Sequence, residues 1–327
     1  MPRTVLASAL LAVVLAGCSS SNGGTGADAS VESGAEEDTG SPVSDGSTGG
    51  PDASTGQDAS TPSDGGSPAD APDESAVPGY TLTWSDEFDG PDGSAPDPAK
   101  WTYDTGGSGW GNNEREYYTS SLANSQQQGG NLVITATPDG ASSLSCWYGT
   151  CLYTSARLKT QGLFAQAYGR FEARAQMPFG KGLWPAFWML GSDISTVNWP
   201  ACGEIDILET IGTDISTNHG SLHAPGYNPT GTYPLPDGGT YAQAFHTFAI
   251  EWEPGEIRFY VDDQLYETQD RSGVPDGGTW EFDTPFFIIL NVAVGGNWPG
   301  DPDSTTTFPQ TLKVDWVRAY QKNGADY

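Results

Sequence analysis

The chain contains few positively charged residues. Among its 327 residues, 13 are Lys or Arg and 42 are Asp or Glu, which gives a formal net charge of −29 at pH 7. A surface of this sign repels nucleic acids and other polyanions, so the sequence argues against a nucleic-acid partner and against a sulfated polysaccharide as substrate. The expected partner is therefore neutral or cationic.

Several catalytic signatures are also missing. The sequence has no Cys and His cluster at zinc spacing, no phosphate-binding glycine loop, and no order of Ser, His and Asp that suggests a hydrolytic triad. No long segment shows a 3.6-residue apolar period, which argues against an architecture of long helices. The remaining candidates for chemistry are carboxyl groups.

The apolar run from Val5 to Ala16 is too short to span a membrane. With Arg3 before it and Leu15-Ala-Gly-Cys18 at its end, it is typical of a secretory signal. The cysteine resembles that of a bacterial lipoprotein box, which implies a signal peptide over residues 1–17, lipidation of Cys18 and anchoring to the cell envelope. Because Ser19 follows the cysteine, the resemblance favours the outer membrane or the cell surface. An ordinary signal peptide with an incidental cysteine is the alternative.

The next segment, residues 18–78, contains no Lys, Arg or aromatic residue and is rich in Ser, Gly, Asp and Pro. Such a segment cannot bury enough apolar surface to offset the entropy of ordering, so a disordered acidic linker is expected. Residues 79–327 are long enough for one domain with a large core. We expect that domain to be monomeric and to contact the membrane only through the lipid anchor.

Residues 79–327 favour an all-β fold. In residues 168–177 apolar and charged side chains alternate, as in a strand that is buried on one face. The apolar run 286–294 is typical of a strand covered on both sides. The 43 Gly and 24 Pro suit many turns, so the strands predict a two-sheet sandwich. The same alternation predicts three further strands, at 248–252, 257–261 and 312–316.

Three acids stand in the apolar segment from Trp199 to Glu209. In an extended strand Glu204 and Asp206 share one face, whereas Glu209 faces the other. A bulge near residues 207–208 would bring Glu209 back beside the other two, and crowding would keep at least one carboxyl pKa high. A glycosidase needs one ionised and one protonated carboxyl group. The alternatives are a solvent-facing acidic strand or a cation site.

Several motifs accompany this segment in order along the chain. They are Trp84-Ser-Asp-Glu-Phe-Asp, Gly109-Trp-Gly-Asn-Asn-Glu114, Tyr168-Gly-Arg-Phe-Glu-Ala-Arg174, Gly182-Leu-Trp-Pro-Ala-Phe-Trp-Met-Leu-Gly191, Gly220-Ser-Leu-His223 and Lys313-Val-Asp-Trp-Val-Arg318. Together they resemble glycoside hydrolase family 16, and in particular its laminarinase-type endo-β-1,3-glucanases, over most of residues 80–320. The resemblance implies a β-jelly-roll (concanavalin-like) sandwich of two curved antiparallel sheets with a substrate cleft on the concave face.

The resemblance also implies roles for residues. Glu204 would be the nucleophile, Glu209 the general acid and base, and Asp206 would tune both pKa values in a retaining endo-hydrolysis of β-1,3-glucan, with no cofactor required for the chemistry. The residues that would bind the sugar chain are Asn112, Glu114, Arg174, Trp184, Trp188, Trp199, His223, Asn297 and Trp298. An ion pair with a sheet neighbour is the alternative for Arg174, and a structural role is the alternative for His223.

Two sites away from the carboxyl groups complete the expectations. Cys146 and Cys151 are expected to form a disulfide in an oxidising compartment, and Cys202 is expected to be a buried apolar residue. By resemblance, Glu87, Gly130 and Asp315 would hold a structural calcium, and oxygen ligands suit that ion. A metal-free structural network is the alternative.

Two other functions stay open from the sequence. One is a sister hydrolase that acts on mixed-linkage β-1,3-1,4-glucan or on another neutral polysaccharide such as agarose. The other is a non-catalytic β-glucan-binding surface protein. The intact set of three acids argues against a binding protein, because a binding surface has no need for crowded carboxyl groups.

Overall fold

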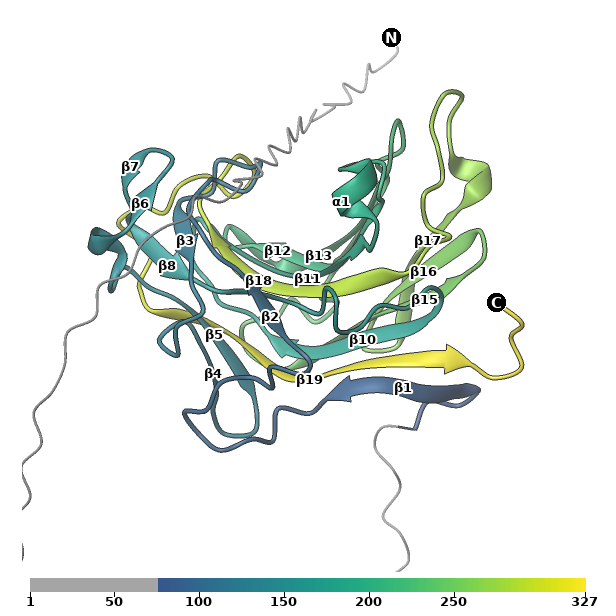
Figure 1. The fold of residues 1–327 in the computed structure, drawn as a ribbon, viewed down its shortest axis with the longest axis horizontal. Helices are drawn as coiled ribbons and strands as arrows, with labels where there is room; N and C mark the ends of the chain where they lie inside the picture. The colour runs from purple at the N-terminus through teal and green to yellow at the C-terminus, as the bar shows by residue number, and fades with distance from the viewer. Residues whose placement is uncertain (1–75) are drawn as a thin grey trace, which may run out of the picture. The chain divides into compact units, whose positions relative to one another are not determined.

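Two stacked β-sheets make up most of the part of the chain that the computed structural model describes, residues 76–327 (Figure 1). The predicted signal peptide (1–17), the lipidated Cys18 and nearly all of the predicted linker (18–78) lie outside the described residues, so those assignments stay predictions. Within residues 76–327, no helix is long and apolar enough to cross a membrane.

The larger sheet, which we call the outer sheet, has eight strands. In spatial order they are β17 (Gln264–Asp270), β16 (Glu256–Val261), β15 (His246–Glu253), β10 (Gly169–Gln176), β19 (Gln310–Lys322), β5 (Leu132–Ala136) and β4 (Ser125–Gln127), with β1 (Tyr80–Asp86) paired to β19. β19 is long enough to pair with β5 along its first half and with β1 along its second half.

The second sheet, the inner sheet, has seven strands. In spatial order they are β14 (Thr230–Pro234), β13 (Asp214–His223), β12 (Glu204–Ile211), β11 (Leu183–Gly191), β18 (Phe286–Val294), β9 (Arg157–Lys159) and β2 (Thr102–Asp104). Figure 1 shows this sheet curved, with its concave side turned away from the outer sheet.

Short elements rise on both sides of the concave face (Figure 1). On one side lie the parallel pair β3 (Glu116–Tyr118) and β8 (Tyr153–Ser155) and the hairpin of β6 (Ser145–Cys146) and β7 (Gly149–Thr150), with the 3-10 turn η1 (Ala141–Ser143) nearby. On the other side lie α1 (Ile194–Val197) and η2 (Arg271–Gly273).

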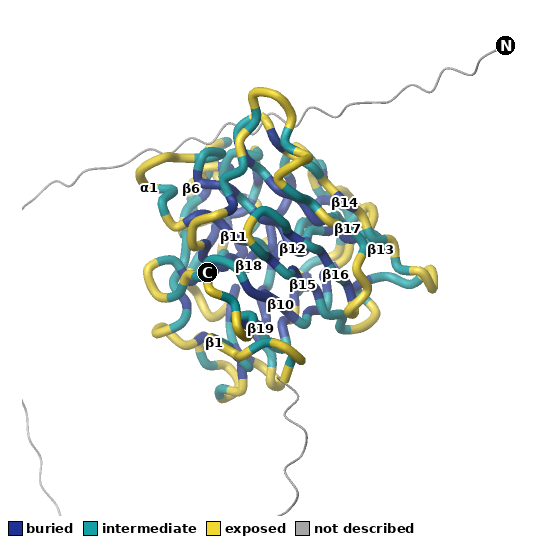
Figure 2. The backbone as a smooth tube through the Cα atoms, turned by 90° about the vertical axis from the view of Figure 1, so that its right-hand side faces the viewer, coloured by how far each residue is buried: buried dark blue, intermediate teal, exposed yellow. Residues whose placement is uncertain are grey.

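The core lies between the two sheets, as Figure 2 shows by the buried backbone at the centre of the molecule. On β10, Phe171 and Ala173 point into this core, which confirms the alternation expected for that segment. All nine residues of β18 are buried, as the unbroken apolar run predicts. The all-β sandwich predicted from the sequence is confirmed.

The opposite face of β10 is less exposed than alternation alone suggests. Arg170 and Glu172 are also buried, and they form an ion pair with 2.8 Å between Nε and Oε2. Tyr320 of the neighbouring β19 donates a hydrogen bond of 2.8 Å to Glu172. A buried ion pair needs such additional partners, because each charge has lost its hydration.

Candidate active site

The three acids of the sequence motif lie on β12, which pairs with β11 and β13 on the inner sheet. Asp206 pairs with Trp188 of β11, but the next pair joins Leu208 to Phe187, so Ile207 is an extra residue with no partner on β11. The register with β13 shifts at the same place. The bulge predicted near residues 207–208 is therefore confirmed, and Ile207 and Leu208 both pack in the core.

Asn218 of β13 holds this bulge in place. Its side chain is fully buried, accepts a hydrogen bond of 3.2 Å from the backbone N–H of Glu209 and donates one of 3.2 Å to the carbonyl of Ile207. A second donated bond, also of 3.2 Å, goes to the hydroxyl of Tyr266. Asn218 thus satisfies two backbone groups that the bulge removes from the ladder, and it fixes the backbone that carries Glu209.

Replacing Asn218 with Ala is expected to lower the free energy of unfolding by about 2–3 kcal/mol, because buried polar groups lose their partners. The same change should reduce kcat more than KM, since the backbone of Glu209 loses its support. Urea unfolding and steady-state kinetics measure the two effects. Ser216→Ala, which removes only a side-chain hydrogen bond to Asp214 at the start of the same strand, is the matched control. Unchanged stability of the Asn218 variant would contradict this role.

Glu204 begins β12 directly after Gly203, whose φ of +76° a residue with a side chain rarely adopts. The indole N–H of Trp199 donates a hydrogen bond of 2.9 Å to Oε2 of Glu204. On the other side, Nε2 of His223 lies 3.9 Å from Oε1 of Glu204 and 3.1 Å from Oδ2 of Asp206. His223 therefore bridges two of the acids.

Glu209 lies further along β12 and has a different set of neighbours. The indole N–H of Trp184 donates a hydrogen bond of 2.9 Å to its Oε1. Trp298 packs edge-on against Trp184, with ring centroids 5.3 Å apart, and against His219, with centroids 4.9 Å apart. Each of the two glutamates thus accepts a hydrogen bond from one indole. Glu209 lies beside packed aromatic rings, whereas Glu204 faces His223.

The electrostatics of the site follow from burial and crowding. Burial and the neighbouring Asp206 raise the pKa of Glu204 to about 8, and the same causes raise the pKa of Glu209 well above its usual range. Burial disfavours a charged His223, but its hydrogen bond to Asp206 and the nearby acids outweigh burial and raise the pKa of His223 to about 10. The protonation of Glu204, of Glu209 and of His223 therefore depends on the charges of their neighbours.

Replacing His223 with Gln is expected to lower the free energy of unfolding by about 1.5–3 kcal/mol near pH 6, because a hydrogen bond between charged groups is lost. The folded pKa of His223 lies above the ordinary 6.5, at about 10, so its contribution is complete below pH 6.5 and is lost as the pH rises through about 10. Urea unfolding of both proteins at pH 6 and pH 10 tests this. An equal difference at both pH values would show that the charged pair is not the source.

Glu204, Asp206 and His223 also satisfy the geometry of a metal site, since one ligand atom from each lies within 4.8 Å of the others. The shortest contact within this group is the ion pair of 3.1 Å between Nε2 of His223 and Oδ2 of Asp206.

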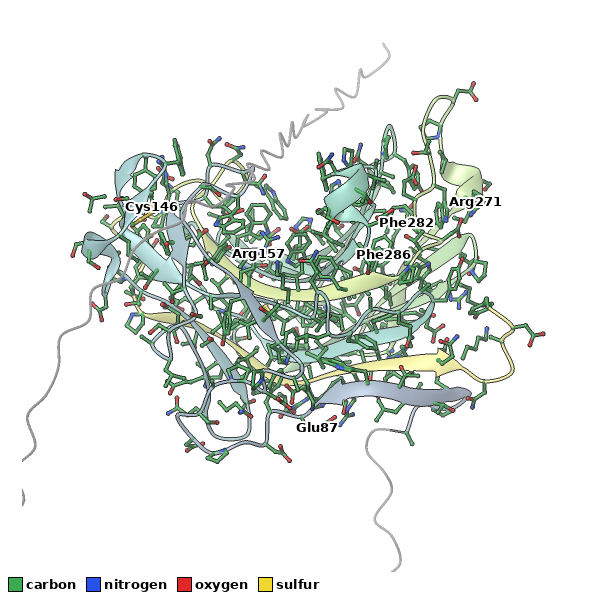
Figure 3. The ribbon with its side chains drawn as sticks, viewed as in Figure 1. Glu87, Cys146, Arg157, Arg271, Phe282 and Phe286 are labelled. Carbon is green, nitrogen blue, oxygen red and sulfur yellow. A yellow bond between two sulfur atoms is a disulfide. The ribbon has the colours of Figure 1, made fainter. Side chains whose placement is uncertain are left out.

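Trp188 and Arg157 lie on the inner sheet beside the acids. The guanidinium of Arg157 lies 4.7 Å from the ring centroid of Trp188 and 5.0 Å from that of Trp110. Asp104 pairs with Arg157 at 3.0 Å. Figure 3 shows Arg157 near the base of the concave face. A cation fixed between two indoles offers both hydrogen-bond donors and apolar ring surface to a sugar.

Glu114 is joined to Trp188 by a chain of hydrogen bonds. Tyr118 donates to Glu114 at 3.0 Å, Asn291 donates to the hydroxyl of Tyr118 at 3.1 Å, and Trp188 donates to Asn291 at 2.7 Å. Glu114 is buried, so its position is fixed by this chain. The chain connects the loop at the edge of the site to the sheet that carries the acids.

A second buried acid, Glu116, lies beside Glu114. The backbone N–H of Val294 donates to Oε2 of Glu116. Burial raises the pKa of Glu114, and burial together with the charge of Glu114 raises the pKa of Glu116 well above its usual range. Both shifts favour a proton on the pair, and such a proton reduces the repulsion between two buried carboxylates.

Asn112 and Asn297 lie together at the rim. The backbone N–H of Asn297 donates to the carbonyl of Asn112 at 2.8 Å, and the amide of Asn112 lies 3.4 Å from Glu114. The structure therefore links eight of the nine predicted sugar-binding residues to the three acids, either directly or through other residues of the site. They are Asn112, Glu114, Trp184, Trp188, Trp199, His223, Asn297 and Trp298.

Arg174 requires a correction. It lies on β10 of the outer sheet, not on the inner sheet that carries the acids. Its guanidinium pairs with Asp315 at 2.5 Å and stacks on Phe245 at 4.8 Å. The alternation of residues 168–177 identified a strand but not which sheet it joins, and the ion pair with a sheet neighbour is the correct interpretation.

Of the positions predicted for calcium, Asp315 lies on β19 of the outer sheet, Glu87 directly follows β1, and Gly130 lies in the turn between β4 and β5. Figure 3 shows Glu87 on the side away from the concave face. The β1–β19 ladder ends at Asp86 and Val317, one residue from Glu87, and Leu132, which follows Gly130 closely, pairs with Val314 beside Asp315. Carboxylate and carbonyl oxygens at these positions are of the kind that calcium binds. Both carboxylates also have arginine partners: Arg318 binds Glu87 at 2.8 Å and Arg174 binds Asp315.

The arrangement of the described cysteines agrees with the prediction from the sequence. Cys146 and Cys151 form a disulfide that closes the β6–β7 hairpin. Cys202 is free and buried, two residues before Glu204. Burial and the charge of Glu204 raise the pKa of the Cys202 thiol to about 12, so it stays protonated and acts as an apolar residue.

A β-sandwich with hydrogen-bonded carboxyl groups and tryptophans on one curved face is the architecture of a polysaccharide-active glycoside hydrolase. Residues 112–318 match the family model of Glycosyl hydrolases family 16, and the chain belongs to this family.

Relatives of known activity support the same assignment. The chain is 43% identical over 262 residues to a beta-glucanase of Rhodothermus marinus, covering 75% of this chain and 86% of the relative. Among solved structures, it is 46% identical to the catalytic domain of an endo-1,3-beta-glucanase (laminarinase) of Thermotoga petrophila RKU-1, with a TM-score of 0.70, covering 75% of this chain and 99% of that one. An endo-beta-1,3-glucanase of Pyrococcus furiosus is also 46% identical, with a TM-score of 0.69, covering 74% of this chain and 94% of that one.

Three residues of the site were not found from the sequence: Arg157, Asn218 and His219. Arg157 carried a usable signal, since it is one of only 13 Lys and Arg and flanks the buried Leu158 in a short strand. Asn218 carried none, because a buried asparagine is recognisable only once the bulge that it fills is seen.

Proposed function

We propose that this glycoside hydrolase cleaves β-1,3-glucan within the chain and with retention of configuration. The observation that carries the proposal is the bulged strand, which brings Glu204, Asp206 and Glu209 to one face, with an indole donor on each of the two outer acids. The resemblance to laminarinases in sequence and fold supports the β-1,3 linkage.

In the first step, Oε of Glu204 attacks the anomeric carbon while the bond to the leaving oxygen breaks. Glu209, whose pKa is raised well above its usual range, gives its proton to that oxygen. Trp199 and His223 favour the ionised form of Glu204 against the effect of its burial. Trp184 and His223 act in the same direction on Glu209, so the choice of Glu209 as the proton donor and Glu204 as the nucleophile rests on the resemblance to the family.

In the second step, the ionised Glu209 takes a proton from water, and the water oxygen bonds to the anomeric carbon as Glu204 leaves. Two displacements on the same carbon restore the original configuration. Asp206, buried between the two acids, keeps its contact with His223 during both steps, so His223 stabilises the negative charge that moves between them.

The purified protein on laminarin, lichenan and agarose tests the substrate, with products sized over time and Glu204→Gln as the inactive control. We expect rapid appearance of mixed short oligomers from laminarin and slower cleavage of lichenan. Cleavage of lichenan or agarose alone would overturn the proposed linkage. Laminarin binding without cleavage of any polymer would overturn the enzymatic proposal.

We also propose a structural calcium at Glu87, Gly130 and Asp315. Support comes from the oxygen donors themselves, since Asp315 lies on β19 and the other two positions flank β1 and β5, the strands that pair with β19. Removal of calcium by EDTA is expected to lower Tm by a few degrees, because a ligand that binds only the folded state stabilises it. Asp315→Asn should abolish this response. A wild-type Tm that is the same with calcium and with EDTA would contradict the proposal.

We propose that the protein is secreted as a monomer and is anchored to the cell envelope through a lipid on Cys18. The support is the sequence alone. Fractionation of cells that express the full chain or Cys18→Ser tests it: the parent should partition with membranes and the variant should not. Equal partitioning of the two proteins would contradict the proposed lipid anchor. Light scattering of the released protein tests whether it is a monomer.

A further inference from the structure

We propose that Trp147 and the pocket beside it form an additional sugar-binding site, which takes a glucosyl unit of the same polysaccharide chain beyond the units held at the catalytic acids. The inference rests on the proposed function, since it names a further site for that substrate. Of the residues expected from the sequence to bind sugar, only Asn297 lines this pocket.

Trp147 is an exposed tryptophan held in a fixed position. It stands at the tip of the β6–β7 hairpin, and 48% of its surface is exposed. The indole N–H donates a hydrogen bond of 2.8 Å to the carbonyl of Glu114, and the guanidinium of Arg115 lies 5.1 Å from the ring centroid. A tryptophan with so many restraints loses little entropy on binding a ligand, which is unusual for an exposed side chain.

The hairpin itself is bound to the loop that carries the rim of the active site. The disulfide Cys146–Cys151 closes it, and the backbone N–H of Trp147 donates to the carbonyl of Gly107 at 2.8 Å. A Cβ atom on Gly107 would lie 2.4 Å from Sγ of Cys146, so only glycine allows this approach. Figure 3 shows Cys146 at the edge of the molecule beside the concave face.

A pocket of about 470 Å³ lies next to the ring, within the range of small-ligand sites. Its walls include Trp147, Asn113, Arg115, Asn297 and Asp301. These groups are held by one another: Asn113 donates to Asn297 at 2.8 Å, and Arg115 binds Asp301 through two contacts of 2.9 Å. The pocket is thus built before any ligand arrives.

The composition of this pocket suits a neutral sugar. An indole provides an apolar face for the C–H groups of a pyranose ring, and planar amide, guanidinium and carboxylate groups bind its hydroxyls. The positive charge of Arg115 is already balanced by Asp301. A charged ligand would have to displace one member of that pair, whereas a sugar hydroxyl can bond to either.

The pocket also adjoins the active site. Gly296 lines the pocket, and a Cβ atom at this glycine would lie 3.1 Å from the carbonyl of Asn112 and 3.6 Å from Cγ of Glu114. The pocket and the rim of the active site therefore lie on opposite sides of the same loop. A glucan chain that leaves the acids past Asn112 would reach Trp147 next.

Calorimetric titration with laminari-oligosaccharides of increasing length tests the site, in the Glu204→Gln background so that no hydrolysis occurs. Adding Trp147→Ala is expected to raise Kd about tenfold for a long oligosaccharide and to leave Kd for a short one unchanged. Trp147→Phe, which keeps a ring but loses the N–H, should recover part of the affinity. Leu152→Ala is the matched control, since Leu152 is 56% exposed near the same hairpin but does not line this pocket.

The outcomes separate this inference from the function on which it rests. A Glu204→Gln parent that binds no glucan overturns the proposed function and the site with it. A parent that binds glucan equally well with and without Trp147→Ala overturns only the site. An equal loss for short and long oligosaccharides also overturns it, because Trp147 would then act through Glu114 in the active site.

Discussion

Replacing Glu204 with Gln is expected to reduce kcat on laminarin by at least about 10⁴-fold, because the amide cannot form the glycosyl-enzyme. Glutamine keeps the size of the side chain and can still accept the hydrogen bond that Trp199 donates to Glu204. Substrate affinity should therefore change little, and the loss should fall on kcat. Steady-state kinetics with calorimetric binding on the same protein separate the two quantities.

Glu172→Gln is the control for this experiment, since Glu172 is a buried acid on the outer sheet, away from the site, with its own ion pair. It should lose stability but keep activity per folded molecule. A Glu204→Gln protein that is folded and still hydrolyses laminarin at a tenth of the parent rate would end the assignment of Glu204 as nucleophile.

Replacing Glu209 with Ala should have effects that depend on the leaving group. On laminarin we expect a loss of about 10³-fold in kcat, because the departing hydroxyl needs a proton. With a dinitrophenyl β-laminaribioside the first step needs no acid, so a rapid burst of dinitrophenolate should precede slow turnover. Added azide needs no general base, so it should restore turnover and yield a β-glycosyl azide.

The matched experiment uses Glu204→Ala. In this variant azide replaces the missing nucleophile and attacks the anomeric carbon of the β-glycoside. A single displacement inverts the configuration, so the product should be an α-glycosyl azide. Opposite anomers from the two variants would assign both roles in a single comparison. An α-azide from Glu209→Ala would reverse the two roles.

Much of the site was predictable because it depends on local sequence. Two facts, the spacing of Glu204 and Glu209 and the apolar residues between them, predict a bulge at Ile207, and the register shift confirms it. The disulfide and the strand 286–294 are also local features, fixed by neighbours in sequence.

What could not be predicted depends on partners far apart in the chain. The sugar-binding role predicted for Arg174 was wrong, because alternation defines the two faces of a strand but not the sheet that the strand joins. The partner of Arg174, Asp315, lies 141 residues away in the chain. The bond from Trp188 to Asn291 spans 103 residues, and the support of the bulge by Asn218 depends on how β12 and β13 pair. Such contacts follow from the order in which the strands pair within each sheet.

The most direct test of the central claim is the configuration of the first product. Proton NMR during the first minutes of hydrolysis of a laminari-oligosaccharide distinguishes the β-anomer from the α-anomer before mutarotation mixes them. Attack by Glu204 followed by attack of water predicts the β-anomer first, with the α-anomer appearing only later. Initial formation of the α-anomer would mean a single displacement by water, and it would contradict the covalent role assigned to Glu204.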